Sequence, residues 1–188
     1  MKKILFLFID IVFLFSSCLS NKPEQIEEQV NNVYHNKIYI PFDSLICIHS
    51  RITVDDNLKY THSRFKILNF VDSKSCSECT ILKMTYWNEY LYSNEEISSA
   101  FIFEANSSII HQIEESYNEC GLDHPIYIDT CGAFRKCNPF IPDNSIFHTL
   151  LLNESDSIIL IGNPLNNEKI AKLYKRVLFE KEQVSEKQ

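Results

Sequence analysis

Apolar runs of strand length alternate with segments of helical periodicity along most of this sequence, and that alternation limits the fold more than any other feature. The runs with the length of a strand lie at 65–71, 100–104, 126–129, 148–153 and 157–161. The segments with helical spacing or helix-end signals lie at 79–92, 108–120, 131–136 and 168–179. Strands that alternate with helices pair in parallel, and the last two runs form an antiparallel hairpin across a polar turn. Because parallel crossovers are right-handed, we expect an α/β fold, a three-layer sandwich with helices on both faces of a central mixed sheet.

Shorter strand-like segments precede this alternating region. They lie at 37–41, 45–48 and 51–54. A chain of 188 residues has room for one ordinary domain and its attachments. The expected parts, in chain order, are a signal peptide over 1–17, a polar tether over 18–32, a strand extension over 33–57, the main domain over 58–180 and a polar tail over 181–188.

The N-terminus has the parts of an export signal. Lys2 and Lys3 supply positive charge, the run over 4–15 is apolar apart from Asp10, and small residues precede Cys18. The apolar run is shorter than a membrane-spanning helix requires. We therefore expect the protein to be exported. It can be secreted in the ordinary way, it can keep the N-terminal segment as an uncleaved anchor, or it can be a lipoprotein.

Residues 15–18 (Phe-Ser-Ser-Cys) resemble a bacterial lipobox, in which the cysteine is acylated and becomes the first residue of the mature protein. The resemblance implies a protein of the cell envelope that is anchored in the membrane through a lipid on Cys18 and faces the periplasm or the cell surface. Leu19 follows the cysteine, where an Asp would suggest retention at the inner membrane. The outer membrane is therefore the favoured location.

Composition and residue spacing exclude several classes of ligand. The formal net charge is −7 and no Lys/Arg cluster offsets it, so we expect no nucleic acid partner, because such binding depends on neutralising phosphates. Only three glycines occur, which excludes the G-x-G-x-x-G and P-loop cradles for nucleotide phosphates. The histidines lack the spacing of a catalytic zinc site. The first expectation is therefore a protein without a cofactor.

A Cys-Ser-Glu-Cys sequence occupies 76–79, between the strand-like run at 65–71 and the helical segment after it. Two residues between cysteines at a helix start bring both sulfurs within disulfide distance. Unpaired N–H groups and the helix dipole favour a thiolate on the first cysteine, and a thiolate is the species that attacks disulfides. This spacing predicts Cys76 as an exposed nucleophile and Cys79 as a buried resolving thiol. The Glu78 carboxylate opposes the thiolate, so we expect the pKa of Cys76 to be less depressed than in strong oxidants.

A buried strand, a polar turn, C-x-x-C at a helix start and a later strand hairpin and helix together resemble the thioredoxin fold, over about residues 58–180. Within that superfamily the chain is similar to the TlpA/ResA-like membrane-tethered thiol-disulfide proteins. Thr149–Asn153 followed by 157–159 resembles their hairpin sequence, and the inserted strand and helix between 100 and 121 also suit them. The resemblance implies a thiol-disulfide oxidoreductase that acts on protein thiols or disulfides in the reductive direction.

Two positions depart from the pattern of this family. Active members carry a cis-proline before the strand corresponding to Thr149–Asn153, where it faces the C-x-x-C and shapes substrate binding; this chain has Phe147 and His148 there. Ser75 stands where many members carry Trp. The resemblance assigns substrate binding to Phe147 and His148. Their departure from proline raises a second hypothesis, a binding or structural lipoprotein without turnover.

A third hypothesis is metal binding. His148 begins the strand that borders the C-x-x-C in this fold, and Cys76, Cys79 and His148 loosely resemble the copper sites of Sco-type thioredoxin-fold proteins. Two thiolates and an imidazole suit a soft copper ion. Sco-type proteins space their cysteines differently, so a copper-binding protein is the lesser alternative.

The remaining cysteines stand at 47, 120, 131 and 137. In an oxidising compartment such residues can pair. Cys131 and Cys137 flank a short predicted helix, and they can bridge each other, or one can pair with Cys120, or they can be buried thiols. The sequence does not choose among these pairings.

Overall fold

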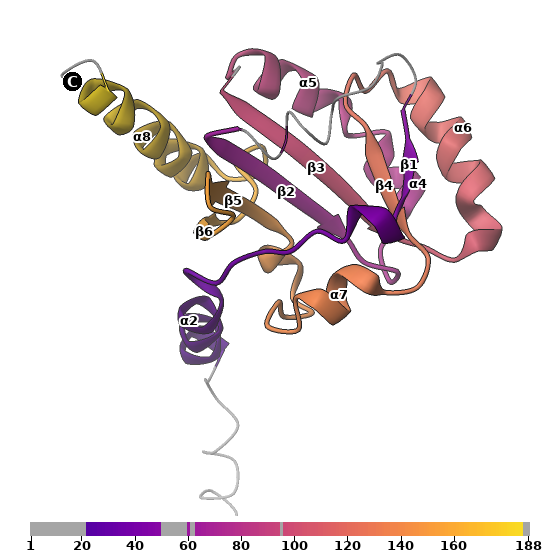
Figure 1. Ribbon diagram of the computed structural model, residues 1–188, viewed down its shortest axis with the longest axis horizontal. Coiled ribbons are helices and arrows are strands. Elements are labelled where there is room, and N and C mark those ends of the chain that lie inside the picture. Colours follow the sequence, from indigo (N-terminus) through magenta and orange to yellow (C-terminus); the bar gives the residue numbers. More distant parts are fainter. Residues whose placement is uncertain (1–21, 50–59, 61–62, 95, 186–188) are drawn as a thin grey trace, which may run out of the picture. The chain divides into compact units, whose positions relative to one another are not determined.

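The computed structural model describes residues 22–49, 60, 63–94 and 96–185 (Figure 1). The chain divides into two compact units, residues 1–32 and 33–188, and the second contains the sheet.

The described part of the N-terminal region is helical. Helix α2 (Lys22–Val33) covers most of the predicted polar tether. The predicted signal peptide, Cys18 and the strand-like segment at 51–54 lie outside the described residues. Among the described helices, none is both long enough and apolar enough to cross a membrane.

A six-stranded mixed sheet forms the centre of the second unit. Its strands are β1 (Ile46–Ile48), β2 (Phe65–Val71), β3 (Ile97–Glu104), β4 (Ile126–Asp129), β5 (Thr149–Asn153) and β6 (Ile158–Ile161). Their order across the sheet is β1-β4-β3-β2-β5-β6. β3 is parallel to both β2 and β4, whereas the pairs β1–β4, β2–β5 and β5–β6 are antiparallel. The mixed sheet with a C-terminal hairpin confirms the predicted α/β class.

Helices cover both faces of this sheet (Figure 1). They are η1 (Phe42–Ser44), α4 (Ser77–Ile81), α5 (Thr85–Tyr92), η2 (Ser107–Ile109), α6 (Ile110–Cys120), α7 (Ala133–Cys137), η3 (Ser145–Phe147) and α8 (Glu168–Ser185), where η marks a 3-10 helix. Apolar side chains of α4, α5, α6 and α8 join one core cluster with the central strands. On the other face, Phe134 of α7 packs on Phe70 of β2, with 4.9 Å between the ring centroids.

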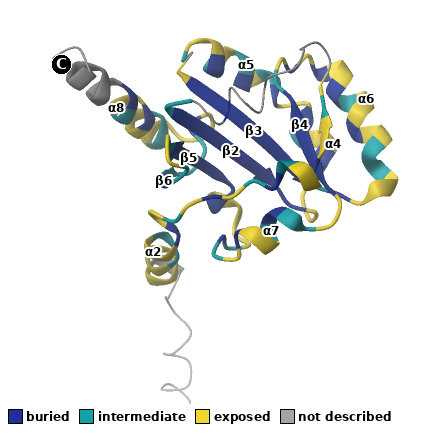
Figure 2. Cartoon of the chain, viewed as in Figure 1, coloured by how far each residue is buried: buried dark blue, intermediate teal, exposed yellow. Residues whose placement is uncertain are grey.

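Alternation along the strands decides which side chains enter the large core. Phe65, Ile67 and Val71 of β2 lie in that core, and the parallel register places Val71 beside Phe103 of β3. These strands are buried along their length (Figure 2). Asn69 shares the parity of these apolar residues and pairs in register with a core residue of β3, so its amide enters the apolar side of the sheet.

The helical segment after the cysteine pair differs from the prediction. The periodicity predicts one helix over 79–92, but the structure has two, α4 and α5, with a turn at 82–84 between them. In this turn the Lys83 N–H bonds to the Thr80 carbonyl at 3.1 Å and the Met84 N–H to the Ile81 carbonyl at 2.8 Å. Such i to i+3 bonds align side chains three residues apart, and Ile81 and Met84 are both buried.

Strand and helix limits also differ from the predictions at several places. β3 begins at Ile97 rather than at 100, because Ser98 and Ser99 are polar in sequence yet buried in the strand. The strand expected at 37–41 is wrong, since only an isolated bridge between Lys37 and Ser157 forms there. The segment expected at 45–48 is β1, which belongs to the same sheet as the later strands. Helix α8 continues to Ser185, into the predicted tail.

Candidate functional site

A tight turn places the cysteine pair directly after the central strand. β2 ends at Val71, and the Ser75 N–H then bonds back to the Asp72 carbonyl at 3.0 Å. The Ser75 hydroxyl also donates to Asp72 Oδ1 at 2.6 Å. This turn reverses the chain so that Cys76 becomes the N-cap residue of α4.

Cys76 and Cys79 form a disulfide, with 5.3 Å between their Cα atoms. Cys76 Sγ accepts the backbone N–H of Cys79 at 3.2 Å. Cys76 is exposed, as predicted, but Cys79 is exposed too, and its expected burial is wrong. The reason is geometric: Ser77 and Ile81 are the buried positions of α4, and residue 79 is half a turn from each of them.

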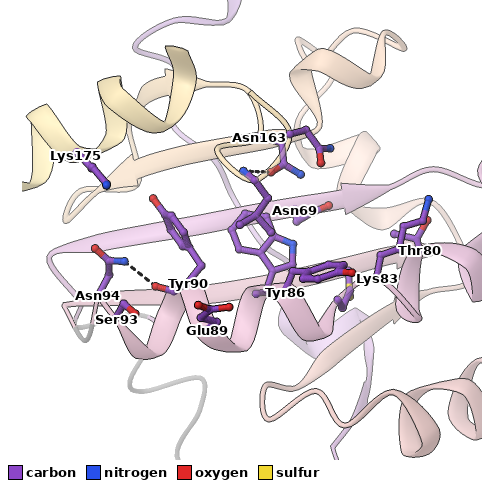
Figure 3. Close-up of a pocket in the computed structure, with 14 residues that line it drawn as sticks. Asn69, Thr80, Lys83, Tyr86, Glu89, Tyr90, Ser93, Asn94, Asn163 and Lys175 are labelled. Carbon is purple, nitrogen blue, oxygen red and sulfur yellow. Dashed lines mark hydrogen bonds between the residues drawn. The ribbon is translucent and has the colours of Figure 1, made fainter. Parts of the chain in front are cut away.

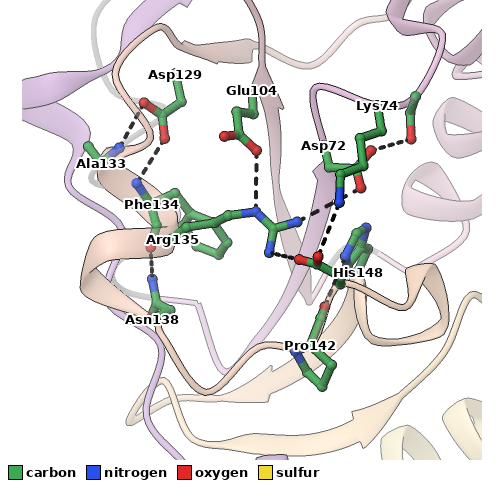
Figure 4. Close-up of polar contacts among 12 residues, drawn as sticks. Asp72, Lys74, Glu104, Asp129, Ala133, Phe134, Arg135, Asn138, Pro142 and His148 are labelled. Atoms are coloured by element: carbon green, nitrogen blue, oxygen red, sulfur yellow. Dashed lines mark hydrogen bonds and ion pairs between the residues drawn. The ribbon is translucent and has the colours of Figure 1, made fainter.

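Arg135 connects this turn to the rest of its face of the sheet (Figure 4). Its guanidinium approaches the carboxylates of Asp72 at 3.8 Å, Glu104 at 3.3 Å and Asp143 at 3.0 Å. It also lies over the Phe70 ring, 4.9 Å from the centroid. Nothing in the sequence indicated a role for Arg135, because two of its acidic partners, Asp72 and Glu104, are distant in the sequence.

Lys74 belongs to the same charged cluster. Its ammonium pairs with Asp143 at 3.1 Å. The hydrogen bond and the charge of Lys74, followed by the charge of Arg135, lower the pKa of Asp143. Lys74 lies two residues before Cys76, so the charged cluster extends into the turn that precedes the disulfide.

Asp129 at the end of β4 organises the loop that carries Arg135. Its Oδ1 accepts the N–H groups of Cys131 at 3.2 Å and Ala133 at 3.0 Å, and its Oδ2 accepts that of Phe134 at 2.8 Å. Between them Gly132 has φ of +67°, in the left-handed region that glycine adopts at least cost. Asp129 is 1% exposed, so these bonds lie where no water competes.

Phe147 and His148, the predicted substrate-binding residues, are both buried. The His148 carbonyl accepts the Phe70 N–H at 2.7 Å, and His148 Nε2 lies 3.2 Å from the Pro142 carbonyl, to which its N–H can donate. The imidazole also meets the Phe70 ring edge to face at 5.2 Å. In this arrangement neither side chain presents an open surface to a substrate. Among the described residues there is no cis peptide bond.

The suggested copper ligands do not gather into a site. In the described part of the chain, no group of three or more His, Cys, Asp or Glu side chains is placed to hold a metal ion. Cys76 and Cys79 form a disulfide with each other, and Nε2 of His148 lies within hydrogen-bond distance of the Pro142 carbonyl. The structure therefore does not bring His148 together with the two sulfurs as a ligand set.

Three of the other cysteines, Cys120, Cys131 and Cys137, are not in disulfides in this structure. Cys131 and Cys137 are exposed and are not bridged, so none of the alternatives left open by the sequence, a bridge between them, a bridge to Cys120 or burial as thiols, is found for them. Cys120 is a buried thiol whose S–H donates to the Tyr117 carbonyl at 3.2 Å. Burial raises the pKa of Cys120, which makes it a poor nucleophile.

His148→Gln is expected to flatten the pH dependence of stability between about pH 7 and pH 5. Burial, as the largest cause, lowers the pKa of His148; the Pro142 carbonyl and the carboxylates of Asp72 and Asp143 oppose this, and Arg135 adds to it. The unfolded chain therefore binds a proton below about pH 6.5 before the native state does. The free energy of unfolding of the wild type therefore falls as the pH drops below about 6.5 toward the pKa of His148 in the native state. The His148→Gln variant has no imidazole at this position, so it should not show this decrease.

Urea unfolding midpoints at the two pH values test this prediction. His111→Gln is the matched control, because the His111 side chain is 82% exposed on α6. If the His148 variant kept the full pH dependence of the wild type, the assigned role of His148 would be wrong.

Comparisons with known proteins place the fold. No family model matches the sequence, and no curated protein sequence matches it either. The structure is similar to a thioredoxin-like protein solved in solution in its oxidised form, with 15% identity and a TM-score of 0.55. That match covers 79% of this chain and 97% of the other.

Two further solved structures match at comparable levels. One is a protein named as a thiol:disulfide interchange protein DsbE, from Chlorobium tepidum, with 12% identity and a TM-score of 0.53 over 77% of this chain and 97% of that one. The other is a mutant of PrxQ from Xylella fastidiosa, with 14% identity and a TM-score of 0.51 over 77% and 96%. With its mixed sheet and the disulfide that follows the central strand, this chain has a thioredoxin-like fold.

Proposed function

We propose that this protein exchanges thiols and disulfides in the cell envelope, with Cys76 as the attacking sulfur and Cys79 as the resolving sulfur. The observation that carries the proposal is the Cys76–Cys79 disulfide at the start of α4, with both residues exposed. A redox-active pair must be reached by a second protein, and an exposed disulfide at a helix start meets that need.

Exposure alone does not distinguish the two sulfurs, but hydrogen bonding does. Cys76 Sγ accepts the Cys79 N–H at 3.2 Å, and a sulfur that already accepts a backbone N–H is better stabilised as a thiolate. This contact favours Cys76 as the first nucleophile. The short helix α4 contributes little beyond this bond, since it ends at Ile81.

The exchange conserves electrons and protons. In the reduced protein, the Cys76 thiolate attacks one sulfur of a substrate disulfide, and the displaced substrate thiolate takes a proton from water. Cys79 then gives up its proton to solvent, and its thiolate attacks Cys76 Sγ, closes the Cys76–Cys79 disulfide and releases the second substrate sulfur as a thiolate that takes a proton from solvent. Two electrons pass to the substrate, and an external dithiol must return the protein to its reduced form.

Membrane attachment is part of the proposal and rests on the N-terminal sequence. A lipid on Cys18, followed by a polar tether, would hold the redox unit at the outer membrane or the cell surface. Metabolic labelling with a radioactive fatty acid tests it, with Cys18→Ala as the comparison. Label retained by the variant would exclude lipidation at this position.

Insulin reduction with dithiothreitol tests the exchange itself. The full-length protein is expected to shorten the lag before insulin precipitates, and Cys76→Ser is expected to leave it at the uncatalysed value. A wild-type protein no faster than dithiothreitol alone would favour a binding or structural role without turnover.

A further inference from the structure

A cavity of about 710 Å³ lies beside the cysteine helix and takes no part in the proposed exchange (Figure 3). Its walls come from β2, from α4 and α5, from the loop after β6 and from α8. Thr80, the residue after Cys79, is one of the lining residues. The volume is in the range of pockets that enclose small organic ligands.

Two polar groups at this cavity lack partners. Asn69 is 8% exposed and Trp87 is 3% exposed, and both line the cavity. Within the described residues, neither the Asn69 amide nor the Trp87 indole N–H makes a side-chain hydrogen bond. The polar atoms of these two side chains are accessible from the cavity rather than sealed in the core, so a ligand that enters the cavity can form hydrogen bonds with both.

Flat side chains form much of the wall. Tyr86, Trp87 and Tyr90 follow one another along α5, and the Trp87 and Tyr90 rings meet edge to face at 5.7 Å. Burial raises the pKa of Tyr90 to about 12, so its hydroxyl remains neutral. Walls of this kind favour a planar ring, which can stack on one aromatic face and meet the edge of another.

Charge at the cavity is positive. Lys83 and Lys175 line it, from the turn before α5 and from α8, against one carboxylate, Glu89 (Figure 3). With the Trp87 indole N–H, the two ammonium groups make three side chains of the lining that only donate hydrogen bonds, against one, Glu89, that only accepts them. The cavity therefore suits a ligand that carries oxygen acceptors and a negative charge.

We propose that this cavity is a binding site for a flat aromatic acid. The ring lies against the aromatic side chains of α5, and its carboxylate pairs with the ammonium groups of the two lysines. A hydroxyl group on the ring forms a hydrogen bond with the Asn69 amide. This site stands independently of the redox proposal, because none of the groups that form it is a cysteine.

The test uses 6-hydroxy-2-naphthoate, which carries a hydroxyl and a carboxylate at opposite ends of a planar ring. Trp87 is the only tryptophan of the chain, so the single indole N–H signal in a ¹H–¹⁵N NMR spectrum of the full-length protein reports on this cavity. We expect a saturable shift of that signal. The uncharged 6-hydroxy-2-naphthamide, and 2-naphthoate without the hydroxyl, are each expected to bind more weakly.

Variants separate recognition from general hydrophobic contact. Asn69→Leu is expected to weaken binding about tenfold, and Lys175→Gln about threefold. Lys172→Gln is the matched control, since this exposed residue of α8 is not among those that line the cavity, and it should bind as the wild type does. Lys175 is exposed, so its variant stays informative even if Asn69→Leu does not fold.

The proposal is overturned by any of three results. The indole signal could fail to saturate at millimolar probe, the amide could bind as tightly as the acid, or Lys175→Gln could bind as tightly as Lys172→Gln. Binding retained by Cys76→Ser supports the site and separates it from the redox activity, whereas binding lost on that substitution counts against it.

Discussion

Cys79→Ser is expected to accumulate a mixed disulfide between Cys76 and its substrate, whereas Cys76→Ser is expected to accumulate none. Without Cys79 the first attack still occurs, but no second thiol displaces the bound substrate sulfur. Without Cys76 the nucleophile itself is lost, and insulin reduction should fall at least about a hundredfold, to the uncatalysed rate. Non-reducing gels of each variant after incubation with a disulfide-bonded protein measure the adduct.

The asymmetry between these variants is the informative part, because both cysteines are exposed in the structure. The hydrogen bond from the Cys79 N–H to Cys76 Sγ is the physical reason to expect Cys76 to attack first. Cys131→Ser is the control for adventitious thiols, since Cys131 is also exposed and unbridged. Equal trapping by the Cys76 and Cys79 variants would contradict the assigned order of attack.

Asp129→Ala is expected to lower the free energy of unfolding by about 2–4 kcal/mol. The carboxylate accepts three backbone N–H groups at the end of β4, from Cys131, Ala133 and Phe134. Alanine leaves these donors without an acceptor in a place where Asp129 is 1% exposed. Urea denaturation followed by far-ultraviolet circular dichroism measures the change.

Two further variants serve as comparisons for Asp129→Ala. Asp129→Asn keeps one acceptor oxygen, so its loss should be smaller than that of alanine. Asp123→Ala removes an exposed carboxylate from the loop before β4 and should change the free energy of unfolding by less than about 0.5 kcal/mol. An Asp129→Ala protein as stable as Asp123→Ala would show that the loop does not depend on this cap.

Much of the sheet could be predicted from the local sequence pattern, because the periodicity of a strand or a helix can be recognised within a short stretch of consecutive residues. β4 and β5 lie within the runs expected for them, and α6 ends at Cys120, where the predicted segment ends, with Gly121 after it in the left-handed conformation. β3 was predicted too short because Ser98 and Ser99 look like turn residues until the sheet buries them. Asn69 did carry a signal: it is an amide within an otherwise largely apolar run.

The sequence by itself determined the alternation of strands and helices and the placement of two cysteines within one turn, since both depend on neighbours along the chain. Only the tertiary structure decided that Cys79 is exposed, because that follows from which side of the short helix α4 packs inward. It also decided that Arg135 meets Asp72 and Glu104, which the strand order brings together from distant segments. Contacts of this kind depend on register and crossovers, which no local periodicity records.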